Sequence, residues 1–388
     1  MPNTSELPLD GLLVVDFSQF LAGPLAALKL ADLGARVIKI EKPVGGDLCR
    51  QLYISNLELD GDSTLFHSIN RNKESYAADL KNPDDLAAVR KLLQKADVMI
   101  ENFRPGVMKK LGLDFESVQQ INPRLVYGSI TGYGTKGPWV TKPGQDLLVQ
   151  SLSGLVWLNG DSDQPPLPFG LAIADMMAGN HLVQGILSLL LRRERKQHGG
   201  LVEVSLFEST LDFQFEVLTT FLNDGGKSPV RSAVNNGHAY LGAPYGIYDT
   251  QDSHIAIAMG SILRLAELLG CKDLLQYHDP KSWFTSRDEI KAILAMHLRT
   301  NTTAHWLSLL EPADYWSAPV LAWSELMKQE AFQVVDMLQE VRSSRGFVMK
   351  TTRCPIHIDG EIYKSSKGAP KIGQDNVALN EEFELRSK

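Results

Sequence analysis

The chain has 388 residues, of which 44% are hydrophobic and 22% are charged, so disordered and fibrous architectures are excluded. It carries 46 acidic and 39 basic side chains, a formal net charge of −7. This is the opposite of the basic surface that nucleic-acid binding needs, so nucleic acid is not expected as a partner. Chains longer than roughly 250–300 residues usually divide into domains, which makes two domains the expectation here.

Cysteine usage and hydropathy predict a cytoplasmic protein. Cys49, Cys271 and Cys354 are far apart and form no CxxC pair, which argues against disulfides and a zinc ribbon. The first eleven residues are polar and show no signal-peptide pattern. The aliphatic-rich run at 186–191 is far shorter than the ~20 residues of a membrane span, so no membrane contact is expected.

Strand-like and helix-like patterns alternate from residue 11 to residue 130. The apolar, β-branched run at 11–17 is typical of a strand buried on both faces. Gly23 and Pro24 open the helix that follows, and Gly34 ends it. The pattern continues with a strand at 35–41, a helix at 83–96, a strand at 97–103, a helix at 115–121 and a strand at 124–130. This spacing implies right-handed crossovers and a mostly parallel, doubly wound sheet of the α/β class.

The second half of the chain changes style. A helix between Phe169 and Arg192 is apolar on most sides and is expected to be deeply buried. A strand at 201–207 and a helix at 207–222 follow, and then turn residues at 225–237 indicate a domain boundary. Beyond it, 246–250 and 254–260 predict an antiparallel hairpin, and strand-like runs at 346–349 and 356–358 precede a polar tail. We therefore expect a large domain at 1–224, a smaller α+β domain at 225–328, and a segment at 329–388 that returns to the large domain.

The predicted sheet edge lacks the standard nucleotide motifs. The first strand-to-helix turn has no GxGxxG and no Walker lysine, so dinucleotide and nucleoside-triphosphate chemistry is not favoured. Lysines instead follow the strand ends, where they either bind a phosphorylated ligand together or are ordinary surface residues. These are Lys39, Lys42, Lys73, Lys81, Lys109 and Lys110.

Asp175 is the most notable acidic residue, because it lies among alanines and methionines at the start of the long helix. A carboxylate in apolar surroundings must be neutralised, hydrogen-bonded or used. A helix N-terminus lowers a carboxyl pKa and keeps the group ionised for nucleophilic attack. The other interpretation is an ordinary helix N-cap. The nine histidines form no metal-binding motif and no GxSxG elbow occurs, so neither a metal site nor a serine triad is predicted.

Several strings together resemble one family. They are PLDGLLVVDFSQFLAGPLAALKLADLGARVIKIEKPVGGD, NRNKESYAADLKN, ADVMIENFRPGVMKKLGLDFESVQQINPRLVYGSITGYGTKGP, GLAIADMMAGNHLVQGILSLLLRR, GLVEVSLFEST and the closing CPIHIDG with KGAPKIGQDN. The chain resembles the class III CoA-transferases, also called the CaiB/BaiF family, over nearly its whole length. The resemblance implies a Rossmann-like large domain built from both chain ends, a smaller central domain, and an interlocked-ring homodimer.

The resemblance also implies a mechanism with Asp175 as covalent nucleophile. Coenzyme A and acyl-CoA would be substrates, a small mono- or dicarboxylic acid would be the other reactant, and no cofactor would stay bound. The carboxylate would form a mixed anhydride with the donor acyl group and release CoA. CoA would then return to form an aspartyl-CoA thioester, and the acceptor acid would repeat the exchange.

Positions that match the family's ligand contacts can be named. For CoA they are Leu21, Ala22, Lys42, Leu80, Lys81, Asn102, Phe103 and Lys110. Gln145 and His238 are expected at the acyl site, where His238, like Tyr240 near it, either lines the pocket or is structural. Arg71, Arg104 and Arg231 are candidates for a second carboxylate of a dicarboxylic acid.

Two departures bear on the activity. Oxalate-using formyl-CoA transferases carry Gln where this chain has Leu21 and Tyr where it has Gln145, so formyl-CoA/oxalate specificity is not expected. The related α-methylacyl-CoA racemases carry a catalytic His at the position of Gln145, and glutamine cannot shuttle a proton at neutral pH. CoA transfer is therefore favoured over two alternatives, an acyl-CoA racemase or epimerase and a non-catalytic acyl-CoA-binding protein.

Overall fold

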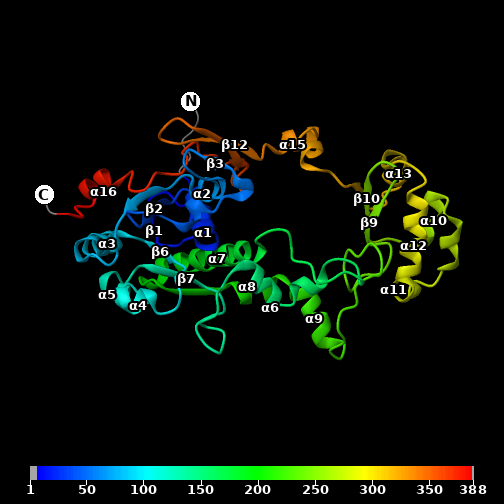
Figure 1. The fold of residues 1–388 in the computed structure, drawn as a ribbon, viewed down its shortest axis with the longest axis horizontal. Helices are drawn as coiled ribbons and strands as arrows, with labels where there is room; N and C mark the ends of the chain where they lie inside the picture. The colour runs from blue at the N-terminus through cyan, green and yellow to red at the C-terminus, as the bar shows by residue number, and fades with distance from the viewer. Residues whose placement is uncertain (1–6, 387–388) are drawn as a thin grey trace. The chain divides into compact units, whose positions relative to one another are not determined.

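A computed structural model describes residues 7–386, and its largest sheet has six parallel strands (Figure 1). The strands are β1 (Leu13–Asp16), β2 (Arg36–Glu41), β5 (Glu74–Ala77), β6 (Val98–Glu101), β7 (Val126–Thr131) and β8 (Gly200–Ser205). They are ordered β5-β2-β1-β6-β7-β8, and every neighbouring pair is parallel. The predicted α/β class with a parallel Rossmann-like sheet is confirmed. The strand order reverses between β1 and β6, which makes a topological switch point there.

Helices cover both faces of this sheet. Alternate residues of β1 face opposite sides, so Leu13 and Val15 contribute to one hydrophobic cluster and Val14 to another. The first cluster includes side chains of α3 (Pro83–Lys95), α5 (Phe115–Ile121) and α16 (Asn376–Glu382). The second includes α1 (Ala22–Asp32) and α7 (Ile173–Lys196). The sheet is therefore doubly wound, and α1 and α7 share one face.

The chain forms two compact units, each with its own core. The first holds the residues up to Val149, Ala172–Phe213, and the residues from Asp336. The second holds Gln150–Leu171 and Gln214–Val335. The expected domain boundaries at 224/225 and 328/329 stay predictions. The two compact units instead divide the chain at 149/150, 171/172, 213/214 and 335/336.

The second unit has an antiparallel sheet of β9 (Gly246–Asp249), β10 (His254–Ile257) and β11 (Ser317–Pro319). The expected hairpin at 246–260 is confirmed by the pairing of β9 with β10. Helices α10 (Ile262–Leu269), α12 (Arg287–Leu298) and α13 (Thr303–Leu310) close a core around buried Tyr248 and Leu294.

The remaining elements are short. They are β3 (Glu58–Leu59), β4 (Asp62–Ser63), α2 (Thr64–Asn70), α4 (Val107–Leu111), α6 (Asp146–Leu152), α8 (Leu206–Phe213), α9 (Phe215–Asn223), α11 (Ser282–Thr285), α14 (Trp323–Leu326), α15 (Glu330–Val335), β12 (Leu338–Arg342), β13 (Val348–Thr352), β14 (His357–Ile358), β15 (Glu361–Ile362), and 3₁₀ turns at Leu48–Gln51, Ile54–Asn56, Leu155–Leu158 and Lys272–Gln276. Residues 7–386 include no helix with the length and apolar character needed to cross a bilayer.

Two sequence expectations for the helices are wrong. The helix expected at 207–222 is two helices, α8 and α9, which meet at Gln214 in a non-helical conformation (φ −96°, ψ 12°). The two compact units also divide there, and no Gly or Pro signals the break. The long helix α7 is buried along one stripe, from Ala174 to Leu190 at three- and four-residue spacing, because it packs on α1 and the sheet. The residues it exposes are mixed, with apolar Met176 and Leu191 beside polar Gln184 and Ser188.

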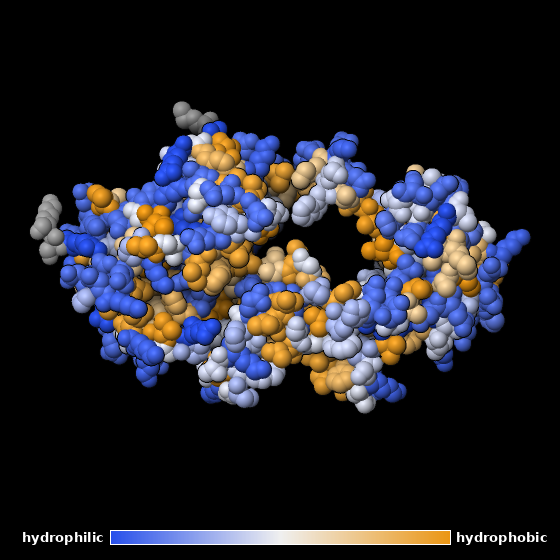
Figure 2. Space-filling view, viewed as in Figure 1, coloured by the Kyte–Doolittle hydropathy of each residue, from blue (hydrophilic) through white to orange (hydrophobic). Residues whose placement is uncertain are grey.

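Apolar side chains also gather on the surface of α9. Phe215 and Leu222 are each 68% exposed, and no residue of this helix is buried. Figure 2 shows hydrophobic atoms at the surface where this helix lies. An exposed apolar face of this kind usually meets a partner surface.

Candidate active site

The predicted CoA-binding residues follow the carboxyl ends of four neighbouring strands. The fold places Leu21 and Ala22 after β1, Lys42 after β2, Leu80 and Lys81 after β5, and Asn102 and Phe103 after β6, with Lys110 in α4 next along the chain. Because the strands are parallel, these ends meet at one edge of the sheet, on both sides of the switch point. This is the edge where open α/β sheets bind their ligands.

The side chains at this edge include both exposed cations and apolar groups. Lys42, Lys81 and Lys110 are exposed and supply positive charge. Leu80 and Phe103 are partly buried and pack against the same hydrophobic cluster. These properties suit a ligand that has both phosphates and apolar parts.

Asn102 joins the two loops at the switch point. Its Nδ2 donates to the Gln19 carbonyl oxygen at 2.7 Å, and its Oδ1 accepts from the Gln19 N–H at 2.8 Å. The loop after β6 and the turn after β1 are therefore tied together by one side chain. Next to it, the buried carboxylate of Glu101 accepts the Phe103 N–H at 2.8 Å, and burial raises the pKa of Glu101.

Two lysines of the expected phosphate cluster are engaged elsewhere, so that part of the prediction is wrong. Lys39 is fully buried within β2, where its Nζ lies 2.9 Å from the Asp47 carboxylate. Lys73 is also fully buried, and its Nζ lies 2.9 Å from an oxygen of Asp16. Both ammonium groups neutralise buried carboxylates, which a sequence pattern of lysines after strands does not reveal.

Asp175 lies where two helices begin. It is the third residue of α7, and Ala172 occupies the N-cap, so the N-cap interpretation of Asp175 is wrong. The backbone N–H of Ala22, the first residue of α1, faces the Asp175 carboxylate closely enough to lower its pKa. The carboxylate is therefore placed against the N-terminus of α1 and within the first turn of α7.

Gly179 makes this approach of the two helices possible. It lies one turn after Asp175 on the same face of α7, and a Cβ at this position would be 2.8 Å from the Ala22 carbonyl oxygen. Any larger residue forces α7 away from the start of α1. Sequence reasoning missed this role, and the four-residue spacing from Asp175 was the available signal.

Asp146 is a second carboxylate at the same place. Its Oδ1 accepts the Ala174 N–H at 2.8 Å, so a residue of α6 caps the start of α7. Gly132 and Gly144 touch backbone to backbone, which closes the intervening loop and brings Asp146 back to the end of β7. The sequence signal for Asp146 was its place directly after Gln145.

The pKa of Asp175 is raised from an ordinary 3.8 to about 7. Burial is the main cause, the negative charge of Asp146 adds to it, and the nearby backbone N–H of Ala22 opposes it. The expectation that a helix N-terminus lowers this pKa is therefore wrong, because desolvation and a like charge outweigh the helix end.

The predicted acyl-site residues lie in different units of the fold. Gln145 is exposed and comes directly before α6, where its carbonyl oxygen accepts the Leu148 N–H at 3.0 Å. His238 belongs to the second unit, where its Nδ1 accepts the Tyr240 N–H at 3.2 Å and its Nε2 lies 3.8 Å from Glu216. Their acyl-site roles stay predictions.

Two of the three arginines named for a second carboxylate already have partners. Buried Arg71 donates to both carboxylate oxygens of Asp32, at 2.5 and 2.8 Å. Buried Arg231 donates to the carbonyl oxygens of Asn159 and Gln164. Arg104 is exposed directly after the ENF segment and stays a candidate.

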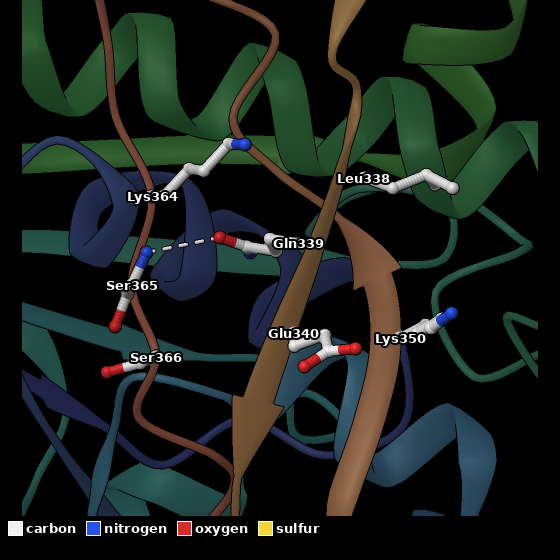
Figure 3. Close-up of a pocket in the computed structure, with 7 residues that line it drawn as sticks. All are labelled: Leu338, Gln339, Glu340, Lys350, Lys364, Ser365 and Ser366. Carbon is white, nitrogen blue, oxygen red and sulfur yellow. Dashed lines mark hydrogen bonds between the residues drawn. The ribbon is translucent and has the colours of Figure 1, made fainter. Parts of the chain in front are cut away.

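A surface pocket elsewhere in the first unit contains none of the predicted site residues (Figure 3). It lies on the β12–β13 hairpin and the segment 364–366, where the Ser365 N–H donates to Gln339 Oε1 at 3.1 Å. Lys364, which lines it, pairs with Asp336 at 2.6 Å. Within residues 7–386, no group of three or more His, Cys, Asp and Glu side chains is arranged to bind a metal ion.

Comparison with known proteins identifies the family. The family model described as CoA-transferase family III matches residues 9–376. The chain belongs to CoA-transferase family III. This family III CoA-transferase is 36% identical to the acetyl-CoA:oxalate CoA-transferase of Acetobacter aceti, over 98% of this chain and 97% of that protein. It is 32% identical to the succinate–glutarate CoA-transferase of Agrobacterium fabrum, over 99% and 97%.

A solved structure gives the same result for the fold. The crystal structure of a CaiB/BaiF family protein from Brucella suis is similar to this CoA-transferase, with a TM-score of 0.84 and 30% identity. The similarity covers 98% of this chain and 100% of that one. The family resemblance and the assignment as a transferase are confirmed.

Proposed function

We propose that this enzyme moves CoA from an acyl-CoA donor to a free carboxylic acid, with Asp175 as the covalent nucleophile. The observation that carries the proposal is the placement of Asp175. Its carboxylate meets the start of α1, which follows β1 at the sheet edge where the predicted CoA-binding residues also lie. A reactive carboxylate beside a CoA site is what acyl transfer through an enzyme-bound intermediate needs.

The first half of the reaction forms two covalent intermediates. The Asp175 carboxylate attacks the thioester carbonyl, a C–O bond forms, the C–S bond breaks, and CoA leaves as a thiolate. The product is a mixed anhydride of Asp175 and the donor acid. The thiolate then attacks the Asp175 carbonyl of this anhydride, which releases the donor acid as a carboxylate and leaves an aspartyl-CoA thioester.

The second half repeats these steps with the acceptor. The acceptor carboxylate attacks the aspartyl thioester, which expels CoA thiolate and forms a second anhydride. The thiolate attacks the acceptor carbonyl, and the new acyl-CoA leaves with Asp175 restored as a carboxylate. Each step exchanges one bond to carbon for another, so the thioester energy is kept, provided that water is excluded.

The residues at the sheet edge would bind CoA by charge and by apolar contact. Lys42, Lys81 and Lys110 are exposed cations for its phosphates, and Phe103 offers a ring for the adenine or the pantetheine arm. Ala22 would orient the nucleophile through its N–H.

The acids are proposed to be short mono- or dicarboxylic acids. The similar proteins are named for oxalate, succinate and glutarate, which supports this size class. The exposed apolar side chains of α9 support a homodimer as the working assembly. A cytoplasmic location stays a prediction from cysteine usage.

Trapping the intermediate tests the proposal. The enzyme is mixed with acetyl-CoA, succinyl-CoA or formyl-CoA, quenched with hydroxylamine and digested, and the peptide with Asp175 is examined by mass spectrometry. A hydroxamate at Asp175 is expected, and Asp175→Asn should show neither the modification nor turnover with a panel of short acids. An unmodified wild-type peptide during turnover, or full activity of Asp175→Asn, would refute the assignment. Exchange of the donor α-proton with deuterated water in the absence of acceptor would instead indicate a racemase.

A further inference from the structure

The segment Asn70–Lys73 is hydrogen-bonded to both ends of helix α1. Lys73 Nζ donates to the Pro24 carbonyl oxygen in the first turn of the helix, at 2.9 Å. At the other end, Arg71 binds Asp32 through two hydrogen bonds, and Asn72 Nδ2 donates to the Ala31 carbonyl oxygen at 3.0 Å. Three side chains of one short segment thus hold α1 at both ends.

The turn that leads into α1 is fixed by buried charged groups. Asp16 Oδ1 accepts the Ser18 N–H at 2.9 Å, and Lys39 Nζ donates to the Ser18 carbonyl oxygen at 2.6 Å. Asp47 accepts the Phe20 N–H at 3.2 Å, and Phe20 has a positive φ of 63°, a conformation that non-glycine residues adopt only when their surroundings impose it. Every residue from Ser18 to Phe20 therefore has a backbone group held by a side chain from another strand or loop, once the Asn102 bonds to Gln19 are included.

The charged groups behind the turn form one connected set, here called the turn network: Asp16, Lys39, Asp47 and Lys73. Lys73 lies 2.9 Å and Lys39 3.9 Å from the same Asp16 oxygen, and Lys39 also pairs with Asp47. Their side chains are at most 1% exposed. Ion pairs this deeply buried contribute little net stability, because desolvation offsets their attraction, and their best-attested use is to specify one geometry.

The turn packs so closely against Gly23 of α1 that no side chain fits between them. A Cβ at Gly23 would lie 2.2 Å from the Ser18 Cβ and 2.5 Å from its Oγ. Gly23 follows Ala22, whose N–H meets the Asp175 carboxylate. The turn therefore packs directly against the first residues of α1, the part of the helix that faces Asp175.

We infer that the turn network and the segment Asn70–Lys73 are positioning elements for the reaction at Asp175, which fix the start of α1 so that the Ala22 N–H is aimed at the nucleophilic carboxylate. This inference rests on the proposed function. None of these side chains acts on substrate; each acts through the α1 backbone. The start of α1 lies against α7 at Gly179, one turn after Asp175. The Ala22 N–H lowers the pKa of Asp175 against burial and the charge of Asp146, so misplacing α1 both misorients the carboxylate and raises its pKa.

The inference can be tested by creating a steric clash in the turn with one substitution and removing it with a second. Gly23→Ala inserts a methyl group against Ser18 and displaces the turn, whereas Ser18→Gly with Gly23→Ala removes the atoms that clash. Gly185→Ala is the matched control, because its Cβ would lie 2.4 Å from Val202 Cγ1, in the packing of α7 on β8. Gly185 is ten residues beyond Asp175, about 15 Å along the helix.

The readouts separate positioning from folding. For each folded variant we measure CoA affinity, the single-turnover rate of Asp175 modification by acyl-CoA, and the pH midpoint of that rate. Gly23→Ala should lose about 10–100-fold in rate, a larger factor than any loss of CoA affinity through Leu21 and Ala22, and should shift the midpoint upward. The Ser18→Gly partner change should restore most of both, and Gly185→Ala should move neither.

A second route removes the charges without leaving one unpaired. Asp16→Asn with Lys73→Met takes away both members of one 2.9 Å ion pair and leaves the pair of Lys39 with Asp47 in place, and the same loss of rate and upward midpoint are expected. Variants that keep the wild-type rate and midpoint, or that lose activity only in proportion to unfolded protein, overturn the inference. A wild-type enzyme in which Asp175 is never modified would instead overturn the proposed function, so the two failures are distinguishable.

Discussion

Asp175 should make the enzyme less stable above neutral pH, and replacing it with asparagine should stabilise the fold. Asparagine has the same shape and can still accept the Ala22 N–H, but it carries no charge to desolvate or to repel Asp146. The pKa of Asp175 is raised from 3.8 to about 7, a difference of roughly three units. At about 1.36 kcal/mol per unit, ionising Asp175 costs about 4 kcal/mol of stability.

The sign follows from proton linkage. Between the unfolded pKa near 3.8 and the folded pKa of about 7, the folded state binds more protons than the unfolded state, so stability falls as pH rises through this window. Below it, the wild-type enzyme and Asp175→Asn should be equally stable. Above pH 7 the variant should be more stable by about 4 kcal/mol, the full cost of ionisation.

Calorimetric unfolding at about pH 4 and about pH 8 measures this difference. Asp175→Asn should raise Tm by several degrees at the higher pH and hardly at all at the lower one. Glu361→Gln, an exposed position on β15, is the control and should change Tm at neither pH. Equal stabilisation at both pH values, or destabilisation at the higher one, would show that burial and Asp146 do not govern this carboxylate.

Three further outcomes follow from the same geometry. Asp146→Asn should lower the pKa of Asp175, so the pH midpoint of covalent modification should fall below 7 in single-turnover kinetics; an unchanged midpoint would show that Asp146 exerts no field there. Gly179→Ala should lower the rate of modification about 10-fold or more, because its Cβ would lie 2.8 Å from an α1 carbonyl oxygen, while circular dichroism shows a folded protein; a wild-type rate would contradict the close approach. Lys42→Ala should raise KM for acyl-CoA with little change in kcat, and the rise in KM should be larger at low salt. Lys350→Ala on β13 should leave KM unchanged. An equal rise in KM for both variants would show that charge at the sheet edge is unimportant.

The sheet was predictable because its central strands are buried on both faces. Strands 13–16 and 98–101 each begin with three consecutive apolar residues, and their spacing leaves room only for helical crossovers. The edge strand β5 has the sequence ESYA, which is too polar to stand out. The hairpin strand β12 was missed as well, because its burial alternates over only five residues.

The candidate site was predictable in position but not in electrostatics. Parallel topology alone brings Lys42 and Asn102 to one edge of the sheet. Which lysine stays exposed depends on carboxylates supplied by distant segments: Asp47 neutralises Lys39, and Asp16 neutralises Lys73. The raised pKa of Asp175 likewise depends on contacts that form only in the folded chain.

The raised pKa of Asp175 also bears on why covalent transfer would proceed at this position. A half-buried carboxylate beside Asp146 is high in free energy when ionised, by about 4 kcal/mol relative to water. Under the proposed mechanism both enzyme-bound intermediates, the anhydride and the thioester, are neutral at Asp175, so forming either one removes the buried charge. Because acylation removes the unfavourable charge, the free energy spent on ionising Asp175 is recovered when the acyl bond forms. This favours attack on the thioester over persistence of the free carboxylate. The Ala22 N–H keeps that cost small enough for the anion to be populated near neutral pH, which is why the position of α1 should matter as much as the carboxylate itself.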